Sequence, residues 1–253
     1  MDVRARVTRV GPLASLIGIY RRRNASYVAK LVGVAAEQEW PTAWWALDGV
    51  EPELAHVTVG AGQGMRLALF NELARHVPEQ GYIVVSDDDV IFTQGNLTGL
   101  VVHCERGRLD LAQPARSDDN SRFEFNVAHT ITRARRLSRI RLTTFVETGP
   151  LIVVGPRWRD RIFPFPEERG MGWGVELDWH ELWKGGCLLG IVDAVRVAHV
   201  GEPGSDYDSG AEAARIHEEL ARRRYEGWQD VQRTVGVWRP WTKTPPWLRN
   251  GTA

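Results

Sequence analysis

Short apolar runs alternate with amphipathic stretches along the first third of the chain. Each run is rich in β-branched or aromatic residues and predicts a strand: residues 16–20, 44–48, 56–59 and the run that begins at residue 82. Between them, apolar residues recur at helical spacing over 27–36 and 65–77. This rhythm predicts a parallel sheet covered by helices, with ligands bound at the carboxyl ends of the strands.

The remainder of the chain is less regular. Further strands are predicted at 109–113, 151–154 and 191–197, and a later helix carries Ile216 and Leu220 on one face. The arginine-rich stretch 133–141 is typical of a solvated surface. The tail, with Trp238, Trp241 and Trp247 among prolines, predicts an extended segment packed across the body.

Three consecutive carboxylates, Asp87, Asp88 and Asp89, follow the apolar run that begins at residue 82. If they were desolvated without a counter-charge, they would repel one another by several kcal/mol. Mg²⁺ or Mn²⁺ resolves this conflict, because both prefer oxygen ligands and keep positions open for phosphate. A solvated acidic turn is the alternative. The position at the end of a strand favours the metal site.

A second polar segment places Trp173 between Gly172 and Gly174, with Glu176 and Asp178 at a predicted helix start. Glycine lets the backbone approach a ligand closely, and the helix dipole favours an ionised carboxylate in the first turn. Either acid is therefore a candidate proton acceptor. A capped helix with solvated acids is the alternative.

His199 comes directly after the strand predicted at 191–197. A lone histidine is usually structural. At the end of a strand, however, it can complete a metal site whose aspartates lie far upstream.

Composition narrows the function classes. The 253-residue chain is 43% hydrophobic and 25% charged, as in soluble enzymes, and its formal net charge of zero argues against nucleic acid as the main partner. Its eleven tryptophans suit both core filling and sugar stacking. Cys104 and Cys187 have no metal-ligand spacing and predict cytosolic thiols. We expect no targeting peptide, no transmembrane span and a cytoplasmic location.

The order of these motifs resembles that of GT-A fold glycosyltransferases, close to the family-2-like group. Four features follow the order found in that group: the segment 20–24, Asp48, the glycine-rich segment 62–66 with Asn71, and the D-x-D run 87–89. The resemblance implies a single α/β GT-A domain over 1–253 with a central, mostly parallel mixed sheet flanked by helices. Residues 12–92 would bind the nucleotide sugar and 93–201 the acceptor. Residues 202–253 would form a helix and a tryptophan-rich tail.

The same resemblance implies roles for individual residues. The donor-binding set is Tyr20, Arg21, Arg23, Asp48, Gly64, Arg66, Asp87 and Asp88. The metal, Mn²⁺ or Mg²⁺, would be held by Asp87, Asp89 and His199. The acceptor would contact Trp173, Gly174 and Glu147, and Glu176 or Asp178 would be the general base.

A nearer resemblance is to an uncharacterised glycosyltransferase-like group of plants and bacteria. It rests on four segments in the same order: Gln113-Pro114, residues 129–133, Phe145-Val146-Glu147 and Gly172-Trp173-Gly174. One departure matters, because many family-2 enzymes have Glu-Asp where this chain has Val175-Glu176. Both acids therefore stay open as the base.

These observations predict a metal-dependent enzyme that moves a sugar from a nucleotide-sugar donor to a hydroxyl of a saccharide or small-molecule acceptor, with inversion. A metal-dependent phosphohydrolase or nuclease is one alternative, because clustered aspartates also activate water. A non-catalytic carbohydrate-binding protein on a degenerate GT-A fold is the other.

Overall fold

The computed structural model describes residues 13–117, 129–200 and 209–248. Its strands are β1 (Ala14–Tyr20), β2 (Thr42–Ala46), β3 (Thr58–Ala61), β4 (Tyr82–Ser86), β5 (Val90–Gln94), β6 (Leu111–Arg116), β7 (Ile140–Thr143), β8 (Leu151–Val154), β9 (Leu189–His199) and β10 (Thr234–Trp238). Its helices are α1 (Ala25–Glu37), α2 (Arg66–Ala74), α3 (Leu97–Gly107), α4 (Arg159–Ile162), α5 (Val175–Lys184) and α6 (Ser209–Arg222).

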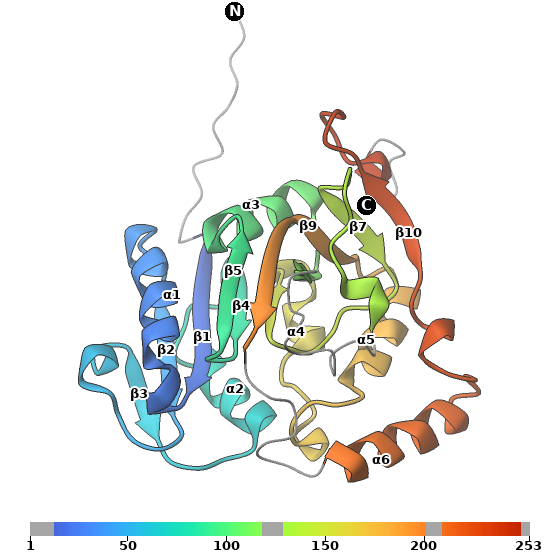
Figure 1. The fold of residues 1–253 in the computed structure, drawn as a ribbon. Coiled ribbons are helices and arrows are strands. Elements are labelled where there is room, and N and C mark those ends of the chain that lie inside the picture. Colours follow the sequence, from blue (N-terminus) through green and yellow to red (C-terminus); the bar gives the residue numbers. More distant parts are fainter. Residues whose placement is uncertain (1–12, 118–128, 201–208, 249–253) are drawn as a thin grey trace, which may run out of the picture.

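The strands form one mixed sheet in the order β10-β7-β9-β6-β8-β4-β1-β2-β3, and β5 pairs with β9 (Figure 1). The first half is parallel, since β1 lies between β2 and β4 in parallel register and β2 continues to β3. In the second half, β8 and β7 run antiparallel to their neighbours, while β6 and β9 are parallel. The predicted mixed α/β sheet flanked by helices is confirmed.

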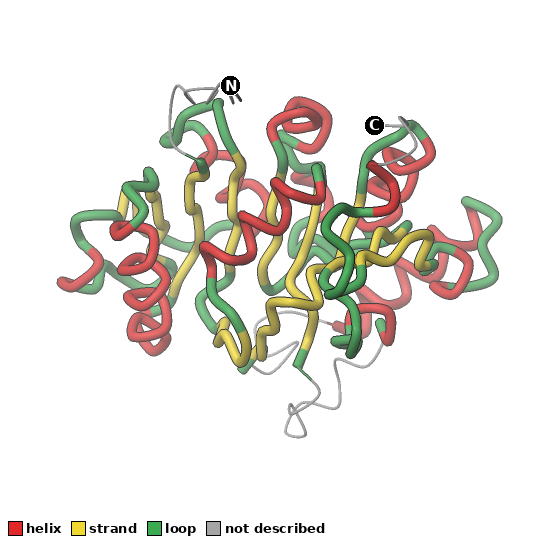
Figure 2. Tube along the Cα trace, turned by 90° about the horizontal axis from the view of Figure 1, so that it is seen from above, coloured by secondary structure: helices red, strands yellow, loops and turns green. Residues whose placement is uncertain are grey.

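Helices cover both faces of the sheet (Figure 2). Leu16 and Tyr20 of β1 pack in the apolar cluster formed with α1 and α3. Ile17 and Ile19, which alternate with them, pack in the cluster formed with α2, α4 and α5. Because its side chains alternate between two covered faces, β1 is buried along its whole length.

A third apolar cluster joins α6 to α5 and to the second half of the sheet. It contains Ile216 and Leu220 of α6 together with Leu177 of α5 and Phe145. The helix predicted from Ile216 and Leu220 is therefore confirmed. In Figure 1, α6 lies along the lower edge of the molecule beside α5.

The arginine-rich stretch 133–141 differs in part from the prediction. Its last residue, Arg141, lies in β7 with a fully buried side chain, and its guanidinium donates to both carboxylate oxygens of Asp193 at 2.8 and 2.9 Å. The interpretation of this residue as solvated surface is wrong. Arginine can lie in a strand of the core when a buried carboxylate and backbone carbonyls satisfy its donors.

The tryptophans mostly fill the core. Trp44, Trp179 and Trp238 are among the largest fully buried side chains, whereas Trp241 is exposed. Trp238 belongs to β10, which pairs with β7, so the tail does pack as an extended segment. Both cysteines are free and buried. None of the helices in the described ranges has the length and apolar character needed to cross a membrane.

Candidate functional site

The three aspartates lie where β4 ends, and each contacts a different part of the protein. Asp87 accepts two hydrogen bonds from Arg66, Nε to Oδ1 at 2.8 Å and Nη2 to Oδ2 at 3.0 Å. Asp88 accepts one from the backbone N–H of Arg21 at 2.7 Å. Asp89 faces His199, with Nε2 of the histidine 2.9 Å from Oδ1 of the carboxylate. The ends of strands β1, β4 and β9 therefore converge on one edge of the sheet, which we call the acidic edge.

The charges of this edge act on one another. Burial raises the pKa of Asp88 to about 6, against the hydrogen bond from Arg21 and with the help of the charges on Asp89 and Asp87. Burial alone would lower the pKa of His199, but the hydrogen bond and the negative charge of Asp89 outweigh it and raise that pKa. The repulsion expected of three adjacent carboxylates is thus only partly compensated by the protein.

The remaining predicted donor residues line the same edge. Arg22, in the 3₁₀ turn after β1 that also contains Arg23, donates its backbone N–H to Asp48 at 2.9 Å. Gly64 is exposed just before α2. The ring of Tyr20 is buried against Trp44, and its hydroxyl lies 2.9 Å from that of Thr58. Any contact of Tyr20 with a ligand at this edge would therefore come from its backbone.

A second row of side chains extends from His199 toward the segments predicted to bind the acceptor. Nη2 of Arg116 lies 3.4 Å from Nδ1 of His199, and its Nη1 lies 3.5 Å from Oε1 of Glu147. The backbone N–H of Glu147 donates to the side chain of Gln113 at 2.6 Å. Glu147 is thereby joined to the acidic edge through a single guanidinium. Arg116 was not predicted as a site residue from the sequence, although it follows the Gln113-Pro114 motif by two residues.

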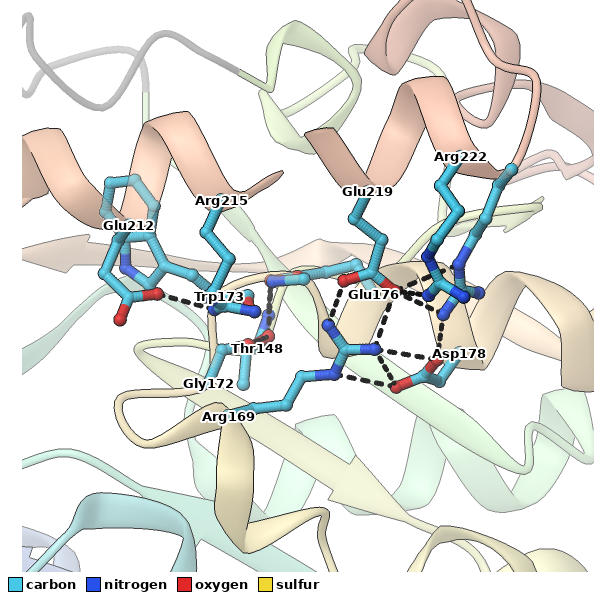
Figure 3. Close-up of polar contacts among 12 residues, drawn as sticks. Thr148, Arg169, Gly172, Trp173, Glu176, Asp178, Glu212, Arg215, Glu219 and Arg222 are labelled. Carbon is cyan, nitrogen blue, oxygen red and sulfur yellow. Dashed lines mark hydrogen bonds and ion pairs between the residues drawn. The ribbon is translucent and has the colours of Figure 1, made fainter. Parts of the chain in front are cut away.

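Glu176 is buried at the start of α5 and is bonded to the protein on both oxygens (Figure 3). Its Oε1 accepts from the backbone N–H of Thr148 at 3.0 Å and from the hydroxyl of the same residue. Its Oε2 accepts from the backbone N–H of Gly174 at 2.9 Å. Thr148 directly follows Glu147, so the two acceptor-side segments predicted from sequence meet here.

Asp178 has a different environment, in an ion-pair cluster between α5 and α6 (Figure 3). Arg169 donates to both of its oxygens at 3.1 and 3.2 Å, and Arg223 donates to Oδ1. The same two arginines bind Glu219 of α6. Asp178 therefore joins the helices. The two candidate bases diverge as their two-residue spacing on a helix requires.

Trp173 directly precedes Gly174, whose backbone N–H donates to Glu176. Its side chain is half-buried against the apolar cluster of α5 and α6, and its carbonyl oxygen accepts from Nη2 of Arg215 at 2.6 Å. Arg215 and Arg169 were missed from the sequence, because an arginine that binds a distant backbone or carboxylate leaves no local signal.

Within the described ranges, no three His, Cys, Asp or Glu side chains form a complete metal site. Among the residues predicted to bind the metal, Asp89 and His199 form a converging set of one carboxylate and one imidazole. That set fits Mg²⁺ or Mn²⁺ chemistry, since Mg²⁺ is commonly held by one or two carboxylates together with substrate phosphates and water.

No protein-family model and no curated protein sequence matches the chain. Solved structures do. GalNAc-T7 with UDP, GalNAc and Mn²⁺ superposes with a TM-score of 0.52 and 11% identity, over 81% of this chain and 48% of that one. S. aureus TarS in complex with UDP-GlcNAc gives a TM-score of 0.50 and 11% identity, over 86% of this chain and 67% of that one. The chain thus spans about half the length of the GalNAc-T7 chain.

At such low identity the likeness establishes the fold alone. The predicted GT-A fold is confirmed.

Proposed function

We propose that the protein is a metal-dependent glycosyltransferase that moves a sugar from a nucleotide-sugar donor to a hydroxyl of a saccharide or small molecule. The observation that carries the proposal is the contact between Asp89 and His199 at the carboxyl edge of a GT-A sheet. Two residues predicted to share one metal, from distant parts of the chain, face each other there. The UDP and UDP-GlcNAc bound to the structural neighbours make a UDP-sugar the first donor to test.

The acidic edge is the donor side. Asp89 and His199 would hold Mn²⁺ or Mg²⁺, with Asp87 as a further ligand if Arg66 releases one of its oxygens. When bound, the cation supplies charge neutralisation on the departing diphosphate. The backbone around Arg21, together with Arg23, Asp48 and Gly64, would contact the nucleotide. Asp88 orients Arg21 through its hydrogen bond.

Glu176 is our preferred general base, and Glu147, Trp173 and Gly174 would contact the acceptor. An ionised carboxylate has about four acceptor positions. Three are occupied by Thr148 and Gly174, which leaves one on Oε2 for an acceptor hydroxyl. Asp178 is engaged by two arginines on the side of α6, and these contacts argue against it as the base. A base facing the acceptor favours an inverting reaction.

A panel of nucleotide sugars, each with and without Mn²⁺, tests the proposal through the thermal unfolding midpoint. A ligand at 100 times its Kd stabilises the folded protein by about 2.7 kcal/mol, so the true donor should stand out, and only with metal. Phosphate release without an acceptor would indicate a phosphohydrolase instead. Stabilisation by free saccharides alone, independent of metal, would indicate a binding protein.

A further inference from the structure

The peptide group between Trp173 and Gly174 is held at both of its polar atoms by side chains. Its carbonyl oxygen accepts from Nη2 of Arg215 at 2.6 Å, and its N–H donates to Oε2 of Glu176 at 2.9 Å (Figure 3). The two atoms belong to one planar unit. Fixing the oxygen therefore fixes the direction in which the N–H points.

The two contacts reinforce each other electrostatically. A guanidinium faces the oxygen and a carboxylate faces the N–H, so each hydrogen bond is charge-assisted. Each also polarises the peptide in the sense that strengthens the other. Gly174 and Glu176 are both buried, so water competes little for the N–H.

Because residue 174 is a glycine, the backbone alone does not fix the orientation of the 173–174 peptide. The φ of Gly174 is +91°, a value that glycine adopts readily and other residues avoid. A glycine here leaves the preceding peptide plane free to rotate at little steric cost. The local sequence thus permits the orientation that Glu176 needs without imposing it.

Arg215 is in turn fixed by α6. Glu212, one turn earlier, lies 2.6 Å from its Nη2. The helix is docked on α5 by Ile216 and Leu220, and by the ion-pair cluster of Arg169, Asp178, Glu219 and Arg223. A side chain on a helix outside the acidic edge thereby reaches the backbone that orients Glu176.

We propose that Arg215 is a positioning residue, which orients the 173–174 peptide and through it the carboxylate of Glu176. The inference rests on the proposed function, because it assigns Glu176 the role of base. It also predicts that turnover depends on a residue of α6, although α6 lies outside the acidic edge.

The test compares Arg215→Met, which keeps the aliphatic stem, with Arg215→Lys and with Arg222→Met. Arg222 is on the same helix, and its exposed side chain reaches Glu219 at 3.4 Å, so it is the matched control. NMR follows the ¹⁵N–¹H signal and the hydrogen exchange of the Gly174 amide. Steady-state kinetics gives kcat and the KM values for donor and acceptor. Thermal unfolding checks that every variant folds.

In Arg215→Met we expect a shifted, faster-exchanging Gly174 amide, a kcat lower by about ten- to a hundredfold, and an unchanged KM for the donor. Arg215→Lys should restore part of the loss, and Arg222→Met should match the parent. An unchanged Gly174 signal, or a normal kcat beside a shifted signal, would overturn the proposal. If the parent itself transfers no sugar, the proposed function fails, and the Gly174 amide alone decides whether Arg215 sets the peptide plane.

Discussion

Arg66 binds both carboxylate oxygens of Asp87 with both partners largely buried, at 2.8 and 3.0 Å. The same guanidinium donates to the carbonyl oxygens of Thr148 at 3.2 Å and Met171 at 3.3 Å. Arg66 therefore neutralises the first aspartate of the acidic run and links it to the two segments that flank Glu176. Metal binding in our account consequently rests mainly on Asp89 and His199.

Arg66→Met should destabilise the protein by about 3 kcal/mol, because it leaves Asp87 as a buried charge without its partner. Denaturant unfolding measures this loss. Mn²⁺ should recover part of it if the cation can replace the guanidinium. The control is Arg75→Met, just after the same helix, whose exposed pair with Glu72 is worth about 0.5 kcal/mol or less. Equal losses in the two variants would contradict a special role for Arg66.

Glu176→Gln should lower turnover by at least about 10²-fold with little change in donor binding, the usual range for loss of a general base. Asp178→Asn should act chiefly on stability, since it weakens the contacts with Arg169 and Arg223. Steady-state kinetics beside thermal unfolding separates the two effects. The reverse pattern would move the base to Asp178, and two mild phenotypes would contradict an inverting mechanism.

Acid should weaken the contact between α5 and α6. The hydrogen bond from Arg169, joined by that from Arg223, outweighs burial and lowers the pKa of Glu219 from 4.5 to about 2. The folded state thus binds fewer protons than the unfolded state in that window. The stabilisation by Glu219 is complete above pH 4.5 and is lost as the pH falls toward 2.

Glu219→Gln should therefore unfold at a lower temperature than the parent at pH 7. This gap between the two unfolding temperatures should close as the pH falls from 4.5 to 2. Glu72→Gln, at an exposed position, is the control and should show almost no gap at any pH. A gap that does not depend on pH would show that the ion pairs are not its source.

The parallel first half of the sheet was predictable from sequence because its signals are local. The run that begins at Tyr82 and the helical periodicity over 65–77 mark β4 and α2 without reference to distant residues. By contrast, no strand was predicted at the position of β5, whose place in the sheet comes from pairing with β9. Such a pairing has no trace in either strand alone.

The site divides in the same way. Asp89, His199 and Glu176 were predicted because each lies at the end of a strand or the start of a helix, where α/β proteins bind their ligands. Their partners were not, since Thr148, Arg116 and Arg215 act through long-range contacts. The burial of Arg141 was missed for the same reason, because Asp193 lies more than two elements away in the chain.

His199→Ala should weaken Mn²⁺ affinity by about 10–100-fold, the loss found when a supporting residue of a metal site is removed. Titration of Mn²⁺ in the presence of nucleotide measures it. His217→Ala, an exposed histidine of α6, is the control for nonspecific loss of imidazole. Coincident titration curves for His199→Ala and the parent would make His199 a structural residue.

The central claim is that Asp89 binds a metal that the nucleotide needs, and calorimetric titration of UDP into the protein with Mn²⁺ tests it most directly. The parent should bind UDP with Mn²⁺ and bind it much more weakly with a chelator present. Asp89→Asn should abolish the metal-dependent part of binding while its thermal unfolding still reports a folded protein. The account is contradicted if Asp89→Asn binds UDP with Mn²⁺ as tightly as the parent does.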